Sequence, residues 1–133
     1  MYRIYSDGGA RGNPGPAACA VVVTENGRIV WEGSEFLGEQ TNNRAEYRGL
    51  IAAVNKALEL KAGEVEFVMD SELVVKQMRG EYRVRSPAIK DLHEDAVALS
   101  SLIPSVGFRH VRREDPFITR ADALLNIELD SQR

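Results

Sequence analysis

The sequence predicts an α/β fold with a mixed β-sheet and helices on both of its faces. Two observations carry this prediction: about the first 40 residues contain only strand-like segments, and the remainder alternates between helix-like and strand-like segments. Strands that follow one another directly form antiparallel hairpins, whereas strands separated by a helix usually pair in parallel. We therefore expect a five-stranded mixed sheet in a single domain that spans residues 1–133.

Five segments have the composition of β-strands. Residues 17–24 are almost entirely apolar, as in a strand that is buried on both faces. The pair Asn26-Gly27 favours a tight hairpin turn before the next strand. The glycines and prolines of residues 8–16 predict a loop. The expected strands cover residues 1–7, 17–24, 28–37, 65–69 and 106–111.

Four segments have the spacing of helices. Leu50, Val54 and Leu58 recur at helical intervals, and Thr41 is one of three residues that can cap this helix. Pro87 suits the first turn of a later helix. The expected helices cover residues 43–60, 71–78, 87 onwards and 121–129.

Composition narrows the class of protein. The chain is 44% hydrophobic and 28% charged, which is typical of globular proteins, and it contains no apolar run of bilayer-spanning length. Cys19 is the single cysteine and lies in an apolar segment, so we expect a small buried side chain and no internal disulfide. The N-terminus lacks the pattern of a signal peptide. We expect a cytoplasmic monomer that needs no membrane and no obligate protein partner.

Charge is unevenly distributed, although the net charge is only −3. Residues 76–90 carry five basic side chains and one acid, and residues 109–113 carry three arginines and His110. Residues 25–39 carry four acids and one arginine. This polarity is typical of a protein that contacts phosphates with one face, but a solvated surface of mixed charge explains it equally well.

Four carboxylates occupy boundaries between expected elements. Asp7 and Asp70 end strands, and Glu46 and Asp122 fall in the first turns of helices. Such boundaries can meet at one rim of an α/β sheet, where clustered carboxylates would hold Mg²⁺ or Mn²⁺. Taken singly, however, each acid could serve only as a turn residue, a helix cap or a partner of the helix dipole.

Four motifs strengthen the reading of these acids as one site. They are Tyr5-Ser6-Asp7-Gly8-Gly9 with Asn13-Pro14-Gly15-Pro16, Thr41-Asn42-Asn43-Arg44-Ala45-Glu46-Tyr47, Asp70-Ser71-Glu72-Leu73-Val74-Val75-Lys76-Gln77, and Ala121-Asp122-Ala123-Leu124. In this order and spacing the chain resembles type 1 ribonuclease H over nearly its whole length. The resemblance is to the compact, prokaryotic or archaeal form that lacks an extra hybrid-binding domain. It implies the ribonuclease H-like fold.

The resemblance also implies an activity. A type 1 ribonuclease H is an endonuclease that hydrolyses the RNA strand of an RNA–DNA hybrid with two Mg²⁺ or Mn²⁺ ions, leaving 5′-phosphate and 3′-hydroxyl ends. The catalytic, metal-binding residues would be Asp7, Glu46, Asp70 and Asp122. Substrate contacts would come from Gly8, Gly9, Asn13, Thr41, Asn42, Asn43, Lys76, Arg79, Arg83 and Arg85. Helix capping remains an alternative role for residues 41–43.

The segment before Asp122 departs from the family pattern. Many members have a histidine in a mobile loop there, but residues 112–120 contain none, and Ile118 replaces a common asparagine. We expect altered loop mechanics, with Arg113 or Glu114 as possible substitutes, and a structural role for His110. Two alternatives to the active hybrid nuclease stay open: a catalytically weak or silent nucleic-acid-binding module, and a nuclease that also cuts double-stranded RNA.

Overall fold

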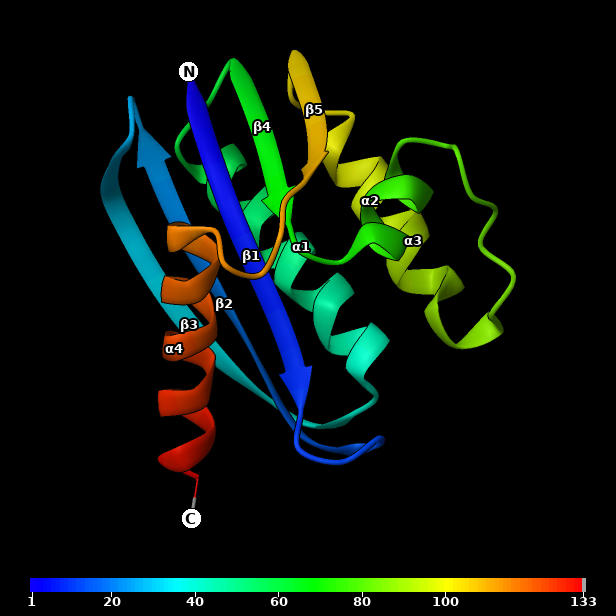
Figure 1. The fold of residues 1–133 in the computed structure, drawn as a ribbon. Helices are drawn as coiled ribbons and strands as arrows, with labels where there is room; N and C mark the ends of the chain where they lie inside the picture. The colour runs from blue at the N-terminus through cyan, green and yellow to red at the C-terminus, as the bar shows by residue number, and fades with distance from the viewer. Residues whose placement is uncertain (133) are drawn as a thin grey trace.

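The computed structural model describes residues 1–132, and its elements follow the predicted order (Figure 1). Three strands come first: β1 (Tyr2–Ala10), β2 (Gly15–Glu25) and β3 (Arg28–Gln40). The remaining elements are α1 (Asn42–Glu59), β4 (Glu64–Met69), α2 (Glu72–Met78), α3 (Pro87–Ser100), β5 (Ser105–His110) and α4 (Pro116–Asp130).

The sheet has the mixed topology that the sequence predicted. Its five strands lie in the order β3-β2-β1-β4-β5. The three N-terminal strands form two antiparallel pairs, whereas β1 pairs with β4 and β4 pairs with β5 in parallel. Because β1 and β4 run in the same direction, with Tyr5 opposite Val68, their later residues Asp7 and Asp70 come to the same region of the sheet.

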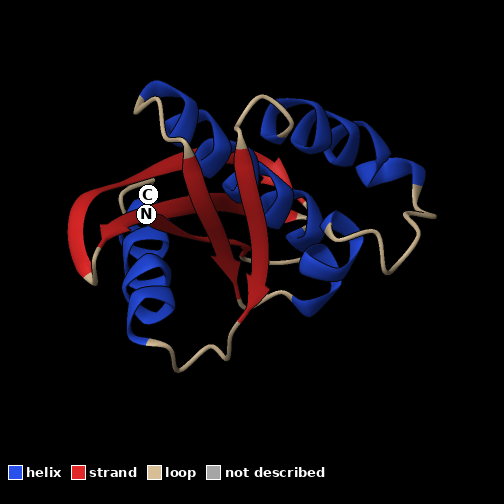
Figure 2. Cartoon of the chain, turned by 90° about the horizontal axis from the view of Figure 1, so that it is seen from above, coloured by secondary structure: helices blue, strands red, loops and turns tan. Residues whose placement is uncertain are grey.

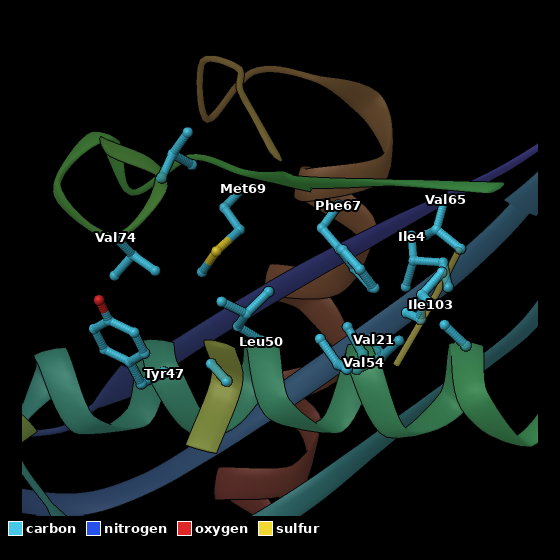
Figure 3. Close-up of a cluster of buried hydrophobic side chains, with 14 of the residues drawn as sticks. Ile4, Val21, Tyr47, Leu50, Val54, Val65, Phe67, Met69, Val74 and Ile103 are labelled. Carbon is cyan, nitrogen blue, oxygen red and sulfur yellow. The ribbon is translucent and has the colours of Figure 1, made fainter. Parts of the chain in front are cut away.

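Helices cover both faces of the sheet. Helix α4 packs against β1, β2 and β3 on one face, and α1 packs on the other face with α3 beside it (Figures 1 and 2). Side chains of β1 alternate accordingly: Ile4 belongs to the core cluster under α1, and Tyr5 to the cluster under α4. Figure 3 shows the first cluster, in which Leu50 and Val54 of α1 face Phe67 of β4. Burial from both sides explains the apolar composition of β2.

The predicted loop over residues 8–16 was wrong in its extent. Strand β1 continues through Ala10, and Gly8 and Gly9 pair with Cys19 and Ala18 of β2. Glycines are poor strand residues in isolation, which is why the sequence indicated a turn. Here both are kept in the strand by pairing with β2, and the missing side chain of Gly8 leaves space for α1.

The predicted start of the last helix was also wrong. Helix α4 begins at Pro116, well before residue 121. Asp115 caps it, accepting hydrogen bonds from the backbone N–H groups of Phe117 at 2.9 Å and Ile118 at 3.3 Å. Ile118 is buried together with Ala121 and Leu125, so the apolar face of the helix extends over the added turn.

Two further predictions concern Cys19 and membrane-spanning segments. Cys19 is buried in β2 as predicted, and this burial raises the pKa of its thiol to about 12, so the thiolate is strongly disfavoured. Within residues 1–132, none of the helices combines the length and the apolar character that a bilayer crossing requires.

Candidate active site

The four predicted carboxylates line one cavity of about 260 Å³. Each comes from a different part of the chain: Asp7 from β1, Glu46 from α1, Asp70 from the residue after β4, and Asp122 from α4. The convergence that the sequence predicted is therefore present. The other lining residues are Gly8, Gly9, Asn42, Arg113, Ile118, Thr119 and Leu125.

The predicted positions of three of these acids within their elements were wrong. Asp7 lies inside β1, because the strand continues to Ala10. Glu46 lies in the second turn of α1, and Asp122 lies still deeper in α4, because both helices start earlier than expected. The helix-dipole role considered for Glu46 and Asp122 depends on a first-turn position, so that alternative loses its support.

Close packing of α1 on β1 brings Glu46 beside Asp7. A Cβ atom on Gly8 would lie 2.1 Å from the carbonyl oxygen of Ala45, and one on Gly49 would lie 2.9 Å from the carbonyl oxygen of Asp7. No side chain fits at either contact. Glycine in both elements thus lets the backbone of the helix approach the strand that carries the central carboxylate.

Asp7, Glu46 and Asp70 share an acidic and partly desolvated environment, whereas Asp122 is exposed. Burial, followed by the charges of Asp70 and Asp122, raises the pKa of Asp7 to about 8. Burial also raises the pKa of Glu46 to about 7, although a hydrogen bond from the Ser71 side chain lowers this pKa. The pKa of Asp70 is raised by burial, while Arg113 opposes the shift. Negative charge at this site is therefore costly without a compensating cation.

The donor set fits divalent cations. Carboxylate oxygens are the ligands that Mg²⁺ and Mn²⁺ prefer, and cations would offset both the desolvation and the mutual repulsion of these acids. Among residues 1–132, no three His, Cys, Asp or Glu side chains are close enough to surround one ion as they stand.

The polar residues at the start of α1 join this helix to the turn between β1 and β2. Asn42 accepts a hydrogen bond from the N–H of Ala10 at 3.0 Å, and its own N–H donates to the side chain of Asn13 at 3.0 Å. Thr41 caps α1 by accepting from the N–H of Arg44 at 3.3 Å. Capping is thus a role of Thr41, and Asn43 stays exposed beside it.

The basic residues predicted to contact substrate lie farther from the carboxylates, none of them lining the cavity. Lys76 pairs with Glu72 at 3.0 Å, and Arg79 pairs with Glu81 at 2.8 Å. Arg83 and Arg85 are exposed in the connector between α2 and α3, which projects from the body of the molecule (Figure 1).

The structure also corrects the expectation of a mobile loop before Asp122. Residues 116–120 form the first turns of α4, and Ile118 is a buried core residue. Arg113 lies in the short connector before this helix and lines the carboxylate cavity. The sequence indicated Arg113 in two ways, as a member of the basic segment 109–113 and, with Glu114, as a substitute for the missing loop histidine. His110 is exposed at the end of β5, where its charge is the smallest of the influences on the pKa of Asp70, and the structural role expected for it stays a prediction.

This sheet, with an acidic cavity between its central parallel strands and two helices, defines a ribonuclease H-like nuclease fold. A family model described as reverse transcriptase-like matches residues 5–125. A ribonuclease H of Polaromonas naphthalenivorans is 35% identical, over 92% of this chain and 83% of the relative. The chain belongs to the ribonuclease H family, and the resemblance found in its motifs is confirmed.

Two solved structures are similar over their whole length. A ribonuclease H1 of Halobacterium salinarum has a TM-score of 0.92 and 39% identity, covering 98% of both chains. A ribonuclease H1 isolated from compost, solved in complex with an RNA/DNA hybrid, has a TM-score of 0.92 and 41% identity, covering 99% of both chains. Neither solved chain has a further domain beyond the part that matches this chain.

The chain spans only part of some relatives. A bifunctional protein of Mycobacterium tuberculosis is 42% identical over 96% of this chain, which corresponds to 35% of that protein. A ribonuclease HI of Halobacterium salinarum is 41% identical, and the match covers 63% of its length.

Proposed function

We propose that this protein is an endoribonuclease that hydrolyses the RNA strand of RNA–DNA hybrids. The observation that carries the proposal is the convergence of Asp7, Glu46, Asp70 and Asp122 on one cavity. A module that only bound nucleic acid would gain nothing from four costly carboxylates. The similarity to a relative solved with an RNA/DNA hybrid supports the choice of substrate.

The four carboxylates would hold two divalent cations, Mg²⁺ or Mn²⁺. When bound, such ions activate a water molecule and stabilise the leaving oxygen of a phosphodiester. Products with 5′-phosphate and 3′-hydroxyl ends are expected. Asp7 is the only buried residue among the four acids, and the charges of the other three raise its pKa. Bound cations would therefore relieve Asp7 most.

The other residues that line the cavity would have different roles in the reaction. Ile118 and Leu125 form an apolar wall that limits access of bulk water. The Arg113 guanidinium, which already acts electrostatically on Asp70, would bind a phosphate oxygen next to the reacting group. The backbone at Gly8 and Gly9, which lines the cavity, would contact the RNA strand.

Recognition of RNA would depend on polar groups beside this rim. The 2′-hydroxyl is both donor and acceptor, and an A-form minor groove presents it to a protein surface. Asn13, Asn42 and Asn43 lie at or near the N-terminal end of α1, where side-chain amides and free N–H groups can bind ribose and phosphate oxygens. Thr41 would contact a phosphate of the DNA strand, and Lys76, Arg79, Arg83 and Arg85 the hybrid backbone.

The proposal is tested with matched end-labelled duplexes of one sequence: RNA–DNA, RNA–RNA and DNA–DNA. Each is incubated with Mg²⁺, with Mn²⁺ and with EDTA. We expect metal-dependent cutting of the RNA strand of the hybrid, with at most weak cutting of RNA–RNA. Hybrid binding without cutting in either metal would instead support the silent module, and equal cutting of hybrid and RNA–RNA would support the broader nuclease.

A further inference from the structure

We propose that the outer edge of β3 is a docking site for an extended segment of a partner protein that carries basic and apolar side chains. We call this surface the β3 edge and define it by residues 31–36 together with the groove that separates them from α1. Its position, its shape and its charge each support the proposal.

The first support is that β3 is an edge strand of the sheet. It pairs with β2 on one side, and within the described residues it has no strand on the other. Register shifts interrupt the pairing between Ile29 and Trp31 and again between Phe36 and Gly38. The intervening residues form a regular stretch that another strand can extend, because a free strand edge presents unpaired N–H and C=O groups.

Apolar side chains are exposed along this strand. Trp31 is 40% exposed and Phe36 is 38% exposed, and Ile29 and Val30 lie just before them at 45% and 52%. Single exposed apolar residues are ordinary, but four of them within residues 29–36 of one edge strand mark an interaction surface.

The second support is the groove between β3 and α1, a hollow of about 430 Å³. Its floor is formed by Cys19, Ala20 and Val21 of β2. The indole of Trp31 lies over Gly33, since a Cβ atom there would be 2.6 Å from the ring. Lys56 of α1 lies over the same ring, with its Nζ 4.0 Å from the centroid. An apolar side chain opposite Gly33 would enter this groove.

The third support is charge. Segment 25–39 carries four acids and one arginine. Glu32 already pairs with Arg120, at 2.9 Å from its Nε, and Glu59 pairs with Lys56 at 3.3 Å. Glu35 is exposed, lines the groove and has no salt bridge among the described residues. A basic partner residue opposite Glu35 would complement this charge. A second copy of β3 would instead bring acids next to acids, which disfavours self-pairing.

The β3 edge lies away from the surface proposed to bind nucleic acid. β3 and β5 are at opposite edges of the sheet, and the basic connector between α2 and α3 projects on the β5 side (Figure 1). A partner could therefore dock on β3 while a hybrid occupies the carboxylate cavity. This inference does not depend on the proposed enzymatic activity.

The experiment uses a capped peptide designed for the β3 edge, Val-Lys-Thr-Val-Lys-Val. In an antiparallel register its first lysine faces Glu35 and its second valine faces Gly33. Trp31 is the only tryptophan, so its fluorescence reports on this groove directly. We expect a saturable fluorescence change and shifts of the β3 backbone amides in NMR spectra. The matched peptide with glutamate in place of lysine should bind at least about tenfold more weakly.

Two variants complete the test. Glu35→Lys should weaken binding of the lysine peptide about tenfold, whereas Glu94→Lys, the same change at an exposed position of α3, should leave it within about twofold. The proposal is overturned by equal binding of both peptides, by a Glu35→Lys variant that binds like wild type, by no saturable change, or by sedimentation that shows β3 paired with a second copy.

Discussion

The carbonyl oxygen of Ala45 lies only 2.1 Å from the position that a Cβ atom on Gly8 would occupy. This contact joins the helix that carries Glu46 to the strand that carries Asp7. Because the neighbouring atoms belong to the backbone, the clash cannot be relieved by rotating a side chain.

Gly8→Ala should therefore separate α1 from β1. We expect the free energy of unfolding to fall by about 1–3 kcal/mol, as in overpacked cores, and hybrid cleavage to fall further than stability explains. Urea unfolding and initial cleavage rates measure the two effects. Gly63→Ala is the matched control, since a Cβ there meets nothing within 4 Å. Equal behaviour of the two variants would show that the Gly8 contact is unimportant.

Asp7→Asn should stabilise the metal-free protein at high pH. The folded protein raises the pKa of Asp7 from 3.8 to about 8, so ionisation of this acid opposes folding. Its unfavourable contribution is absent below the unfolded pKa, grows as pH rises from about 4 to 8, and then levels off. Removing the Asp7 carboxylate should raise the free energy of unfolding by at least about 1 kcal/mol at pH 8 and should change it little at pH 4.

Thermal unfolding in EDTA at both pH values measures this difference. Mg²⁺ should reverse the order at pH 8, because an ion that binds only the folded wild type stabilises it by mass action. If Asp7→Asn lowered the melting temperature in EDTA at pH 8, ionised Asp7 would not destabilise the folded protein.

Arg113→Ala should change the pH dependence of cleavage. The guanidinium holds down the pKa of Asp70, so its removal should shift the acidic limb of the kcat profile to higher pH and lower kcat. Arg113→Lys keeps the positive charge, so its acidic limb and its kcat should lie between those of the wild type and Arg113→Ala. Arg112→Ala is the control, because Arg112 does not line the cavity. Superimposable profiles for Arg112→Ala and Arg113→Ala would remove Arg113 from the site.

Arg83→Ala and Arg85→Ala should weaken hybrid binding without slowing the chemical step. Each residue that pairs with a phosphate contributes roughly 1 to the slope of log affinity against log salt. Binding measured at several salt concentrations gives this slope, and Lys61→Ala supplies an exposed basic control at the far end of α1. An unchanged slope would place the α2–α3 connector outside the interface.

Much of this architecture could be predicted from local pattern. The apolar run of β2, the Asn26-Gly27 turn and the Thr41 cap are local signals, and the structure bears them out. The convergence of four acids could be predicted because parallel strand ends and adjacent helices meet at one rim.

The errors have specific physical causes. Gly8 and Gly9 indicated a turn, and only the packing of α1 explains why glycine is needed at position 8 within a strand. The stretch before Asp122 was expected to be a loop, although Asp115-Pro116 is a strong helix start. The sequence named Arg113 beside Glu114 but could not choose between them, because the contact of Arg113 with the cavity depends on the fold. The groove beside Trp31 is formed by elements distant in sequence, so no local pattern indicates it.

Cleavage of an end-labelled RNA–DNA hybrid by Asp7→Asn in Mg²⁺ and Mn²⁺ tests whether the carboxylate cavity is the active site. Asp95→Asn, an exposed change of the same kind on α3, is the control, and circular dichroism checks that both variants fold. We predict that Asp95→Asn cuts at the wild-type rate and that Asp7→Asn is slower by more than about a hundredfold. A wild-type rate for Asp7→Asn would contradict the assignment of the carboxylate cavity as the active site.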